Sequence, residues 1–212
     1  MGPKQLRSTG RTTGGVGAMD GLRVILALAL ALPAIAVSGR EPSLIEVVGR
    51  YAASRPATAP ASGIEVAFSP DQGAEDLVVK FINSAQKSLR VAAYSFTSKP
   101  IAEALVSARK RGVDVQIVVD KSQKQERYTS ATFTANSGIP TRVDSQYAIF
   151  HNKFIVADET HVETGSFNFS ASAAHRNAEN VLLIWNNPQL AKTYLAKWQG
   201  YWNESENYEP RY

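Results

Sequence analysis

The chain of 212 residues contains no cysteine. Structural disulfides are therefore excluded, and so is any zinc site with thiolate ligands. The absence leaves the cellular compartment open, because an exported protein of this length can bury enough apolar surface to fold without disulfides. The length is sufficient for one domain of ordinary size and a tail.

A strong net charge is also missing from the part of the chain that we expect to fold. Residues 1–50 contain six Lys/Arg and three Asp/Glu, whereas residues 51–212 contain 17 and 16. Any surface that binds nucleic acid must therefore be a local one, because the overall charge of the domain does not favour it. No internal repeat is visible in the sequence.

The chain lacks an apolar run long enough for a typical membrane-spanning helix. The longest run, 24–37, has 14 residues and includes Pro33, whereas roughly 20 residues are needed. Arg23 precedes the run, and Ala34-Ile35-Ala36 supplies small residues at cleavage spacing, as in a secretory signal peptide. We therefore expect an exported protein, most simply of the bacterial periplasm. An uncleaved membrane anchor is the alternative.

This interpretation divides the chain into four parts. Met19 begins a compact charged leader, and if the protein starts there, residues 1–18 are an upstream extension without structure. Residues 19–37 form the signal peptide or anchor, and residues 38–63 form a linker of Pro, Ala, Ser and Thr. Residues 64–212 form the folded domain.

Strand and helix patterns alternate along this domain. Short runs rich in Val and Ile indicate strands, and apolar residues at helical spacing indicate helices. The expected strands are 64–68, 89–96, 113–119, 141–143 and 180–185, with two more in the motif described next. The expected helices are 71–85, 99–111, 123–136, 170–175 and 188–202. Such alternation predicts the α/β fold class, with a mixed β-sheet flanked by helices.

Two short segments near the C-terminal end bring chemically active side chains together in the pattern H-x-K-x4-D-x6-G-S-x-N. Its fixed positions are His151, Lys153, Asp158, Gly165, Ser166 and Asn168. Both segments look like strands, and residues i and i+2 of a strand point to the same face. If the strands pair as a hairpin across 158–160, an imidazole, an ammonium, a hydroxyl and a carboxamide converge on one patch. Such a patch suits a phosphate diester.

The pattern resembles the HKD motif of the phospholipase D superfamily and matches it at all six defining positions. Six identities at fixed spacing make this resemblance specific. From about Ile64 to Trp202 the chain is also similar to the small periplasmic endonucleases of conjugative plasmids, which carry one motif. The segments that carry this closer likeness are 91–97, 110–115, 135–140 and 162–169.

The resemblance implies a role for the side chains that would touch the substrate. His151 is the expected catalytic nucleophile, with an imidazole that attacks phosphorus. Lys153, two residues away, is expected to hold the phosphate as a point charge. Ser166 and Asn168 are expected to donate hydrogen bonds to the phosphate oxygens.

Other positions are expected to support the site. Asp158 is expected to be structural, through backbone hydrogen bonds at the bend, and Gly165 to allow close approach of the backbone at the phosphate. By analogy with the similar nucleases, Glu179 is expected to orient the catalytic histidine. His161 and His175 are expected to be surface residues. Because the histidines lack metal-ligand spacing, we expect neither a metal nor another cofactor.

The superfamily reaction resembles a two-step displacement that uses two histidines. Because this chain carries one motif, the simplest completion is a homodimer that brings two copies of His151 and Lys153 together on a twofold axis. The closest resemblance implies an endonuclease that hydrolyses DNA, with RNA as a further substrate. A phospholipase or cardiolipin hydrolase acting on lipid phosphodiesters is the first alternative.

The second alternative is a non-catalytic DNA-binding component of a conjugation or secretion system. The intact pair of His151 and Lys153 argues against it. The basic cluster Arg109-Lys110-Arg111 would add contacts to a nucleic-acid backbone, unless it is only a solvated helix end.

Overall fold

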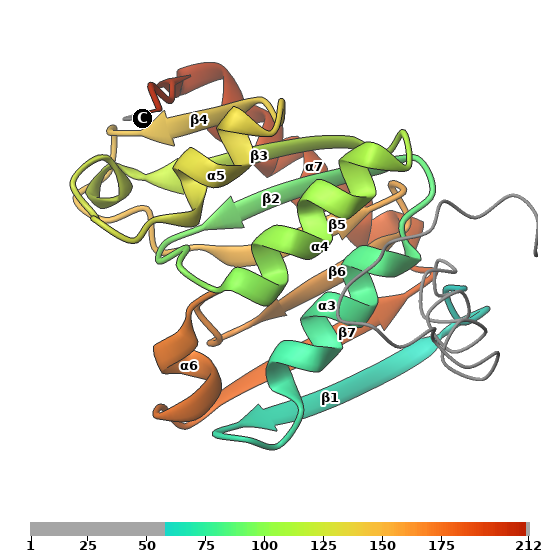
Figure 1. Ribbon diagram of the computed structural model, residues 1–212. Coiled ribbons are helices and arrows are strands. Elements are labelled where there is room, and N and C mark those ends of the chain that lie inside the picture. Colours follow the sequence, from blue (N-terminus) through green and yellow to red (C-terminus); the bar gives the residue numbers. More distant parts are fainter. Residues whose placement is uncertain (1–57, 211–212) are drawn as a thin grey trace, which may run out of the picture. The chain divides into compact units, whose positions relative to one another are not determined.

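The computed structural model describes residues 58–210. The expected upstream extension, the signal peptide or anchor and most of the linker lie outside this range. Its core is an eight-stranded mixed sheet with helices on both faces (Figure 1), which confirms the expected α/β class. None of the helices between residues 58 and 210 is long and apolar enough to cross a membrane.

The strands follow the order β1-β7-β6-β5-β2-β3-β4-β8 across the sheet. They are β1 (Gly63–Ser69), β2 (Ser88–Ala93), β3 (Asp114–Asp120), β4 (Thr141–Asp144), β5 (Lys153–Ala157), β6 (His161–Gly165), β7 (Glu179–Trp185) and β8 (Glu206–Asn207). Strands β2, β3 and β4 are parallel neighbours, and the other neighbouring pairs are antiparallel. Parallel neighbours need crossover connections, which helices supply here.

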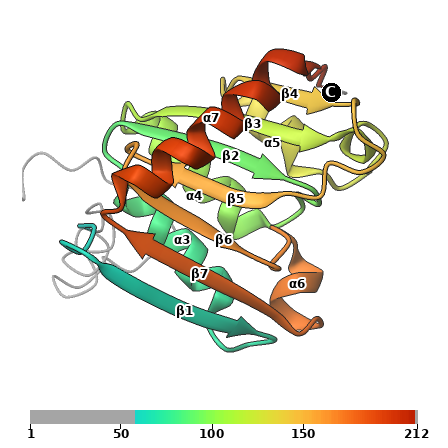
Figure 2. The ribbon, with the colours of Figure 1, turned by 180° about the vertical axis from the view of Figure 1, so that it is seen from behind.

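The helices divide unequally between the two faces of the sheet. They are α3 (Ala74–Ser84), α4 (Lys99–Lys110), α5 (Ser130–Asn136), α6 (Ala171–His175) and α7 (Pro188–Glu204), with a 3-10 turn, η1, at Lys121–Lys124. Helices α3 to α6 lie on one face (Figure 1). Helix α7 crosses the other face over β6, β5 and β2 toward β4, and it leaves β1 and β7 uncovered (Figure 2).

The sheet separates two apolar clusters. The larger one lies under α3 and α4 and contains Phe81, Ile82 and Leu105. The smaller one lies under α7 and contains Phe154 and Trp198. The central strands are buried on both faces, as their continuous runs of Val, Ile and Ala indicate.

One expected helix is wrong in extent. The segment 123–136 is not continuous: η1 ends at Lys124, and α5 begins only at Ser130. The Thr129 hydroxyl accepts a hydrogen bond from the Ala131 N–H and caps the new helix. The cap therefore begins a new helix in the middle of the segment. The loop 125–129 separates this helix from η1 and lines a groove described below.

Four segments of the chain meet at one edge of the sheet, called the site edge below. Strand β2 ends there at Ala93, which pairs with Lys153, the first residue of β5. Strand β6 ends there at Gly165, and β7 begins beside it at Glu179. Antiparallel pairing places the start of one strand beside the end of its neighbour, so residues distant in sequence become adjacent.

Candidate active site

The two motif segments form the expected hairpin. Strands β5 and β6 pair antiparallel, with Phe154 opposite Thr164. Asp158 and Glu159 form the turn, with φ of 52° and 60°. They are the two central residues of a β-turn that the hydrogen bond from the Thr160 N–H to the Ala157 carbonyl (3.1 Å) closes, and a type I′ turn requires positive φ at both. The open end of the hairpin lies at the site edge.

The strands are shorter than the motif, however, so four motif residues lie outside strands. Asp158 is in the turn, and His151, Ser166 and Asn168 are in loops. Loop hydrogen bonds hold the backbone here, such as the bond from the Tyr94 N–H to the Asn152 carbonyl (2.9 Å). Tertiary contacts, and not strand periodicity, therefore orient these side chains.

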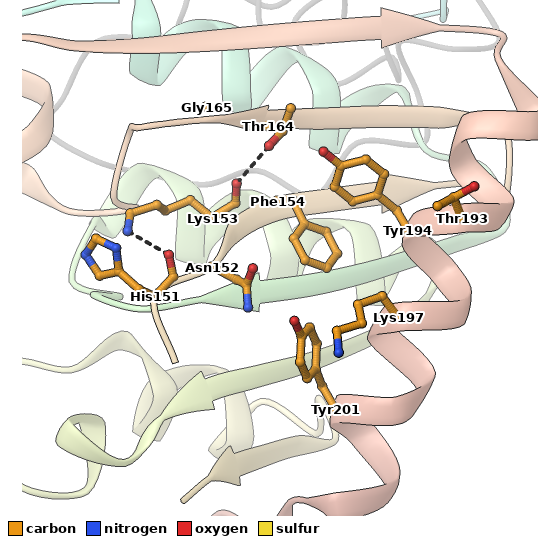
Figure 3. A pocket seen from close by; sticks show the side chains of 10 residues that line it. All are labelled: His151, Asn152, Lys153, Phe154, Thr164, Gly165, Thr193, Tyr194, Lys197 and Tyr201. Atoms are coloured by element: carbon orange, nitrogen blue, oxygen red, sulfur yellow. Dashed lines mark hydrogen bonds between the residues drawn. The ribbon is translucent and has the colours of Figure 1, made fainter. Parts of the chain in front are cut away.

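His151 and Lys153 lie together, as expected, but in different environments. His151 is exposed to solvent, whereas Lys153 is buried, with only 8% of its surface exposed. The Lys153 Nζ donates to the His151 carbonyl (2.9 Å), a bond drawn in Figure 3. Tyr94 contacts both residues: its ring lies 4.6 Å from the imidazole and 5.3 Å from the Lys153 Nζ.

The charge of Lys153 is incompletely compensated. Burial lowers the pKa of Lys153, and the negative charge of Glu179 opposes this shift. No carboxylate forms an ion pair with Lys153 among the residues between 58 and 210. A desolvated ammonium whose partners are a neutral carbonyl and an aromatic ring attracts an anion strongly, so this position favours a phosphate.

The Ser166 hydroxyl and the Asn168 carboxamide, the neutral polar groups of the motif, differ in the hydrogen bonds that they can offer a ligand. The Ser166 Oγ accepts hydrogen bonds from the backbone N–H (3.1 Å) and the Nδ2 (3.3 Å) of Asn180, so its own proton is left to donate. The Asn168 Oδ1 is buried and lacks a hydrogen-bond partner in the described part of the chain. A ligand or water with a donor group would satisfy it.

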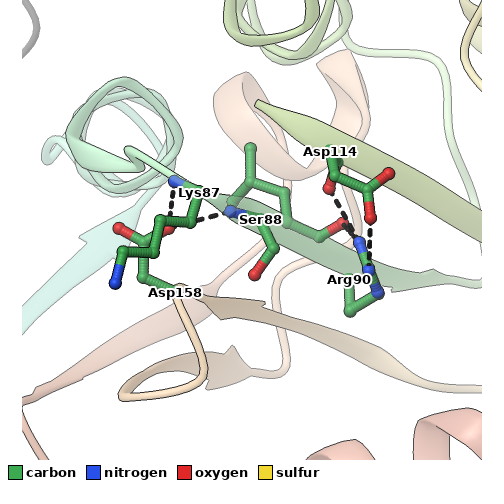
Figure 4. Close-up of polar contacts among 6 residues, drawn as sticks. Lys87, Ser88, Arg90, Asp114 and Asp158 are labelled. Atoms are coloured by element: carbon green, nitrogen blue, oxygen red, sulfur yellow. Dashed lines mark hydrogen bonds and ion pairs between the residues drawn. The ribbon is translucent and has the colours of Figure 1, made fainter. Parts of the chain in front are cut away.

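Asp158 has structural contacts far from the phosphate position. Its carboxylate accepts hydrogen bonds from the backbone N–H groups of Gln86 (2.9 Å), Lys87 (2.7 Å) and Ser88 (2.9 Å). Figure 4 shows the contacts of Asp158 with Lys87 and Ser88 beside the ion pair of Arg90 with Asp114. The carboxylate thus fixes the closed end of the hairpin to the start of β2.

Gly165 is needed for the packing of two strands. A Cβ at this position would lie 2.2 Å from the Asn180 carbonyl oxygen of β7, so β6 and β7 can approach this closely only at a glycine. The expected approach of the Gly165 backbone to the phosphate stays a prediction.

Glu179 lies at the site edge but makes no hydrogen bond to His151 in the part of the chain that the structure describes. Its Oε1 accepts from the Asn177 Nδ2 (3.1 Å). Its charge acts on Lys153 instead, where it raises the pKa of the ammonium. The expected role of Glu179 in orienting the histidine stays a prediction.

The other two histidines occupy opposite edges of the sheet. His161 begins β6 at the edge away from His151, where its Nδ1 accepts from the Asn186 N–H (2.8 Å). His175 ends α6, on the side of the site edge, and its Nδ1 lies 2.8 Å from the Asp71 carboxylate, which raises its pKa. No three His, Asp or Glu side chains gather as metal ligands within residues 58–210.

A groove of about 350 Å³ begins at His151 and Lys153 and runs toward α7. In Figure 3, Phe154 forms its floor, and Tyr194, Lys197 and Tyr201 line it from α7. The sequence alone did not single out these α7 residues or Tyr94, because aromatic residues at helical or strand spacing are ordinarily core residues. The basic cluster Arg109-Lys110-Arg111 lies at the far end of α4, away from the site edge.

Comparison with known proteins identifies the family. The sequence profile described as "Cardiolipin synthase, PLD-like domain" matches residues 78–202, more than half of the chain. The chain belongs to the phospholipase D-like family. Membership places it among the phosphodiesterases of the phospholipase D superfamily, as the HKD pattern predicts.

Relatives within this superfamily differ in their names. Phospholipase D of Rickettsia prowazekii is 37% identical over 137 residues, which are 65% of this chain and 66% of that protein. The mitochondrial cardiolipin hydrolase of Xenopus laevis is 30% identical over 140 residues, 66% of this chain and 64% of that protein. The matches thus span somewhat less than two thirds of these relatives.

Solved structures show the same phospholipase D-like fold. The phospholipase D family member Nuc from Salmonella typhimurium is 46% identical, with a TM-score of 0.68, and the match covers 70% of this chain and 99% of that one. NucT from Helicobacter pylori, 22% identical, has a TM-score of 0.63 over 69% of this chain and 99% of that one. At this identity the second likeness supports the fold alone.

Proposed function

We propose that this phospholipase D-like chain is an endonuclease that hydrolyses DNA, and RNA as a further substrate, without a metal ion. The observation that carries the proposal is the pairing of an exposed His151 imidazole with the buried Lys153 ammonium, which forms no ion pair with a carboxylate of the described residues. The 46% identity across nearly all of Nuc supports it. Export to the periplasm remains part of the proposal and rests on the sequence of residues 24–37.

In the proposed reaction, His151 attacks phosphorus, and the bond from phosphorus to the leaving oxygen breaks. A second imidazole gives its proton to that oxygen. It later takes a proton from the water that attacks the phosphohistidine, and the bond from phosphorus to the His151 nitrogen breaks. Lys153 and the Ser166 hydroxyl stabilise the charge on the non-bridging oxygens. The described part of one chain holds a single imidazole in this position, so the second must come from another copy.

A second copy has a suitable surface to occupy. On the face that α7 leaves uncovered, Ile64, Val66 and Phe68 of β1 are 69%, 58% and 51% exposed. They pair across the sheet with Ile184, Leu182 and Asn180 of β7. This uncovered face reaches the site edge, because Asn180 also bonds Ser166. A homodimer that buries this face would bring the two copies of His151 toward each other.

Phospholipid hydrolysis is the second candidate function. The names of the Rickettsia and Xenopus relatives favour it, and so do two exposed apolar side chains in the loop before His151, Tyr147 (40%) and Ile149 (54%). The deciding assay incubates the full chain with plasmid DNA, with RNA and with vesicles containing cardiolipin, side by side. Cleavage of lipid with no cleavage of nucleic acid would overturn the endonuclease proposal. A non-catalytic DNA-binding protein would bind DNA without cutting it.

Cleavage should persist when divalent cations are removed. The two lysines of a dimeric site and the hydroxyl donors neutralise the phosphate, so no Lewis acid is required. We expect the rate on plasmid DNA to change by less than about twofold in excess EDTA, measured by gel electrophoresis over time. Loss of activity in EDTA that Mg²⁺ or Zn²⁺ restores would contradict this mechanism.

Mixed dimers should reveal a shared active site. If equal amounts of wild-type and His151→Ala chains are unfolded and refolded together, about a quarter of the dimers are fully wild type. We expect activity to fall to about a quarter of that of an all-wild-type sample at equal chain concentration. Self-sufficient chains would retain about half. Mixing with His175→Ala chains, which should be active, is the matched control.

A further inference from the structure

A second groove, of about 330 Å³, lies beside the active site and contains no motif residue. One wall is the start of α4, with Thr97 and Lys99. The other wall is the loop 125–129 and α5, with Arg127, Tyr128 and Phe133. We call it the flanking groove. The groove exists only because helical structure is interrupted between η1 and α5, where the sequence predicted one continuous helix.

The flanking groove is joined rigidly to the catalytic residues. Tyr94, whose ring contacts His151, is only three residues before Thr97, a span of about 10 Å in extended chain. The N–H groups of Thr97 and Ser98 both donate to the carbonyl of Phe169 (2.9 Å each), the residue after Asn168 of the motif. One wall of the groove is thus bonded directly to the residue that follows the motif.

The opposite wall is fixed to the same segment. The Ser130 N–H donates to the Phe96 carbonyl (2.7 Å), which attaches the start of α5 to the chain between Tyr94 and Thr97. The buried Gln123 side chain accepts from both the Phe96 N–H (3.3 Å) and the Thr129 hydroxyl (2.9 Å). The groove is therefore preformed, and a ligand would not have to order it.

The side chains in the groove suit a nucleobase next to a phosphate. Tyr128 is 72% exposed and Phe133 is 46% exposed, so both present aromatic surface to solvent. The Arg127 guanidinium lies 5.5 Å from the Tyr128 ring centroid and has no ion-pair partner among the described residues. Exposed rings that stack bases, with cations that follow the backbone, are the means by which proteins hold single-stranded nucleic acid.

The charges also discriminate against a lipid chain. Lys99, Glu103 and Arg127 all border the groove, and the ion pair between Lys99 and Glu103 is exposed and long at 3.7 Å. An acyl chain would have to desolvate these charges without compensation. A base can stack on Tyr128 while Arg127 stays solvated beside the phosphate. Binding a nucleotide therefore removes less water from the charged side chains than binding an acyl chain would.

We infer that the flanking groove binds an unpaired nucleotide next to the scissile phosphodiester, with its base stacked on Tyr128 and its phosphate beside Arg127. The inference rests on the proposed endonuclease function and specifies its substrate: the chain prefers single strands, since bases in a duplex are already stacked and paired. The full chain should therefore bind a single-stranded oligonucleotide more tightly than the corresponding duplex.

The test compares Tyr128→Ala with wild type on two substrates. One is a single-stranded oligonucleotide of about 12 nucleotides, a length chosen to span a site of the usual size. The other is bis(4-nitrophenyl) phosphate, which is too small to reach the groove from His151. On the oligonucleotide we expect KM to rise about five- to hundredfold with kcat little changed. On the small diester we expect no change in either constant.

Matched variants distinguish the loss of the stacking ring or of the positive charge from a general loss of folded protein. Tyr128→Phe keeps the ring and should behave as wild type, whereas Tyr128→Leu keeps apolar surface without a ring and should resemble Tyr128→Ala. Arg127→Gln should weaken binding and reduce its salt dependence. Arg109→Gln removes the same charge at the far end of α4 and should change neither property.

Two outcomes would overturn the inference while leaving the endonuclease proposal intact. One is an unchanged KM of Tyr128→Ala for an oligonucleotide that wild type cuts. The other is an equal rise of KM for both substrates. Anisotropy of a fluorescent oligonucleotide measures binding separately from cleavage. If wild type binds no oligonucleotide and cuts none, but hydrolyses the small diester, both the endonuclease proposal and the inference are wrong.

Discussion

Replacing His151 with alanine should lower the rate of phosphodiester hydrolysis by about 10⁴-fold or more. Loss of a positioned acid or base alone costs about 10²- to 10⁴-fold, and His151 is also the proposed nucleophile. The imidazole is exposed, and its ring lies 4.6 Å from the ring of Tyr94. The fold should therefore tolerate the change, and thermal unfolding of the variant should match wild type within a few degrees.

The same residue should carry a covalent intermediate. Single-turnover reactions quenched in alkaline detergent should leave a phosphoryl group on the peptide that contains His151, because phosphohistidine survives base and is lost in acid. His175→Ala is the control: this imidazole lies on the side of the site edge but is bonded to Asp71, so its loss should change the rate little. An adduct on another histidine, or full activity of His151→Ala, would refute the assignment.

Replacing Glu163 with glutamine should stabilise the protein at neutral pH. Glu163 is fully buried in β6 between Ile155 of β5 and Leu183 of β7. Neither carboxyl oxygen has a hydrogen-bond partner in the described part of the chain. Burial raises the pKa of Glu163 well above its ordinary value of 4.5, so the folded state holds a proton that the unfolded state releases.

The sign of the pH dependence follows from this difference. The folded state of wild type is fully favoured below the unfolded pKa near 4.5 and loses stability as the pH rises toward the folded pKa. Within this window the loss is about 1.4 kcal/mol per pH unit. Glutamine keeps the size and polarity of the side chain but does not ionise. The advantage of Glu163→Gln should therefore grow with pH through this window.

Urea unfolding of wild type and Glu163→Gln at several pH values between 5 and 8 measures the effect. Glu209→Gln, at an exposed position, is the matched control and should shift neither the midpoint nor its pH dependence. Parallel curves for wild type and Glu163→Gln across this range would show that the carboxyl ionises freely in the folded state. A lower midpoint for the variant at all pH values would show that the glutamine amide is tolerated less well than the acid.

The sequence by itself determined the hairpin, the closeness of His151 and Lys153 along the chain and the α/β class. These features depend on short-range regularities. Residues two apart on a chain stay close whatever the rest of the fold does. The turn at Asp158 and Glu159 is likewise local, because it joins two strands that are adjacent in sequence. Alternating strand and helix patterns then limit the architecture to few solutions.

Only the tertiary structure decided which distant groups meet these residues. Asp158 binds backbone N–H groups about 70 positions earlier in the chain, and Gly165 is required by the carbonyl of Asn180 on a neighbouring strand. No local pattern encodes such partners, because they depend on strand order and register. The start of α5 is likewise held by a distant partner, the Phe96 carbonyl, which accepts from the Ser130 N–H, and the flanking groove lies beside it. Contacts between segments far apart in sequence thus determine how the site is supported and what lies beside it.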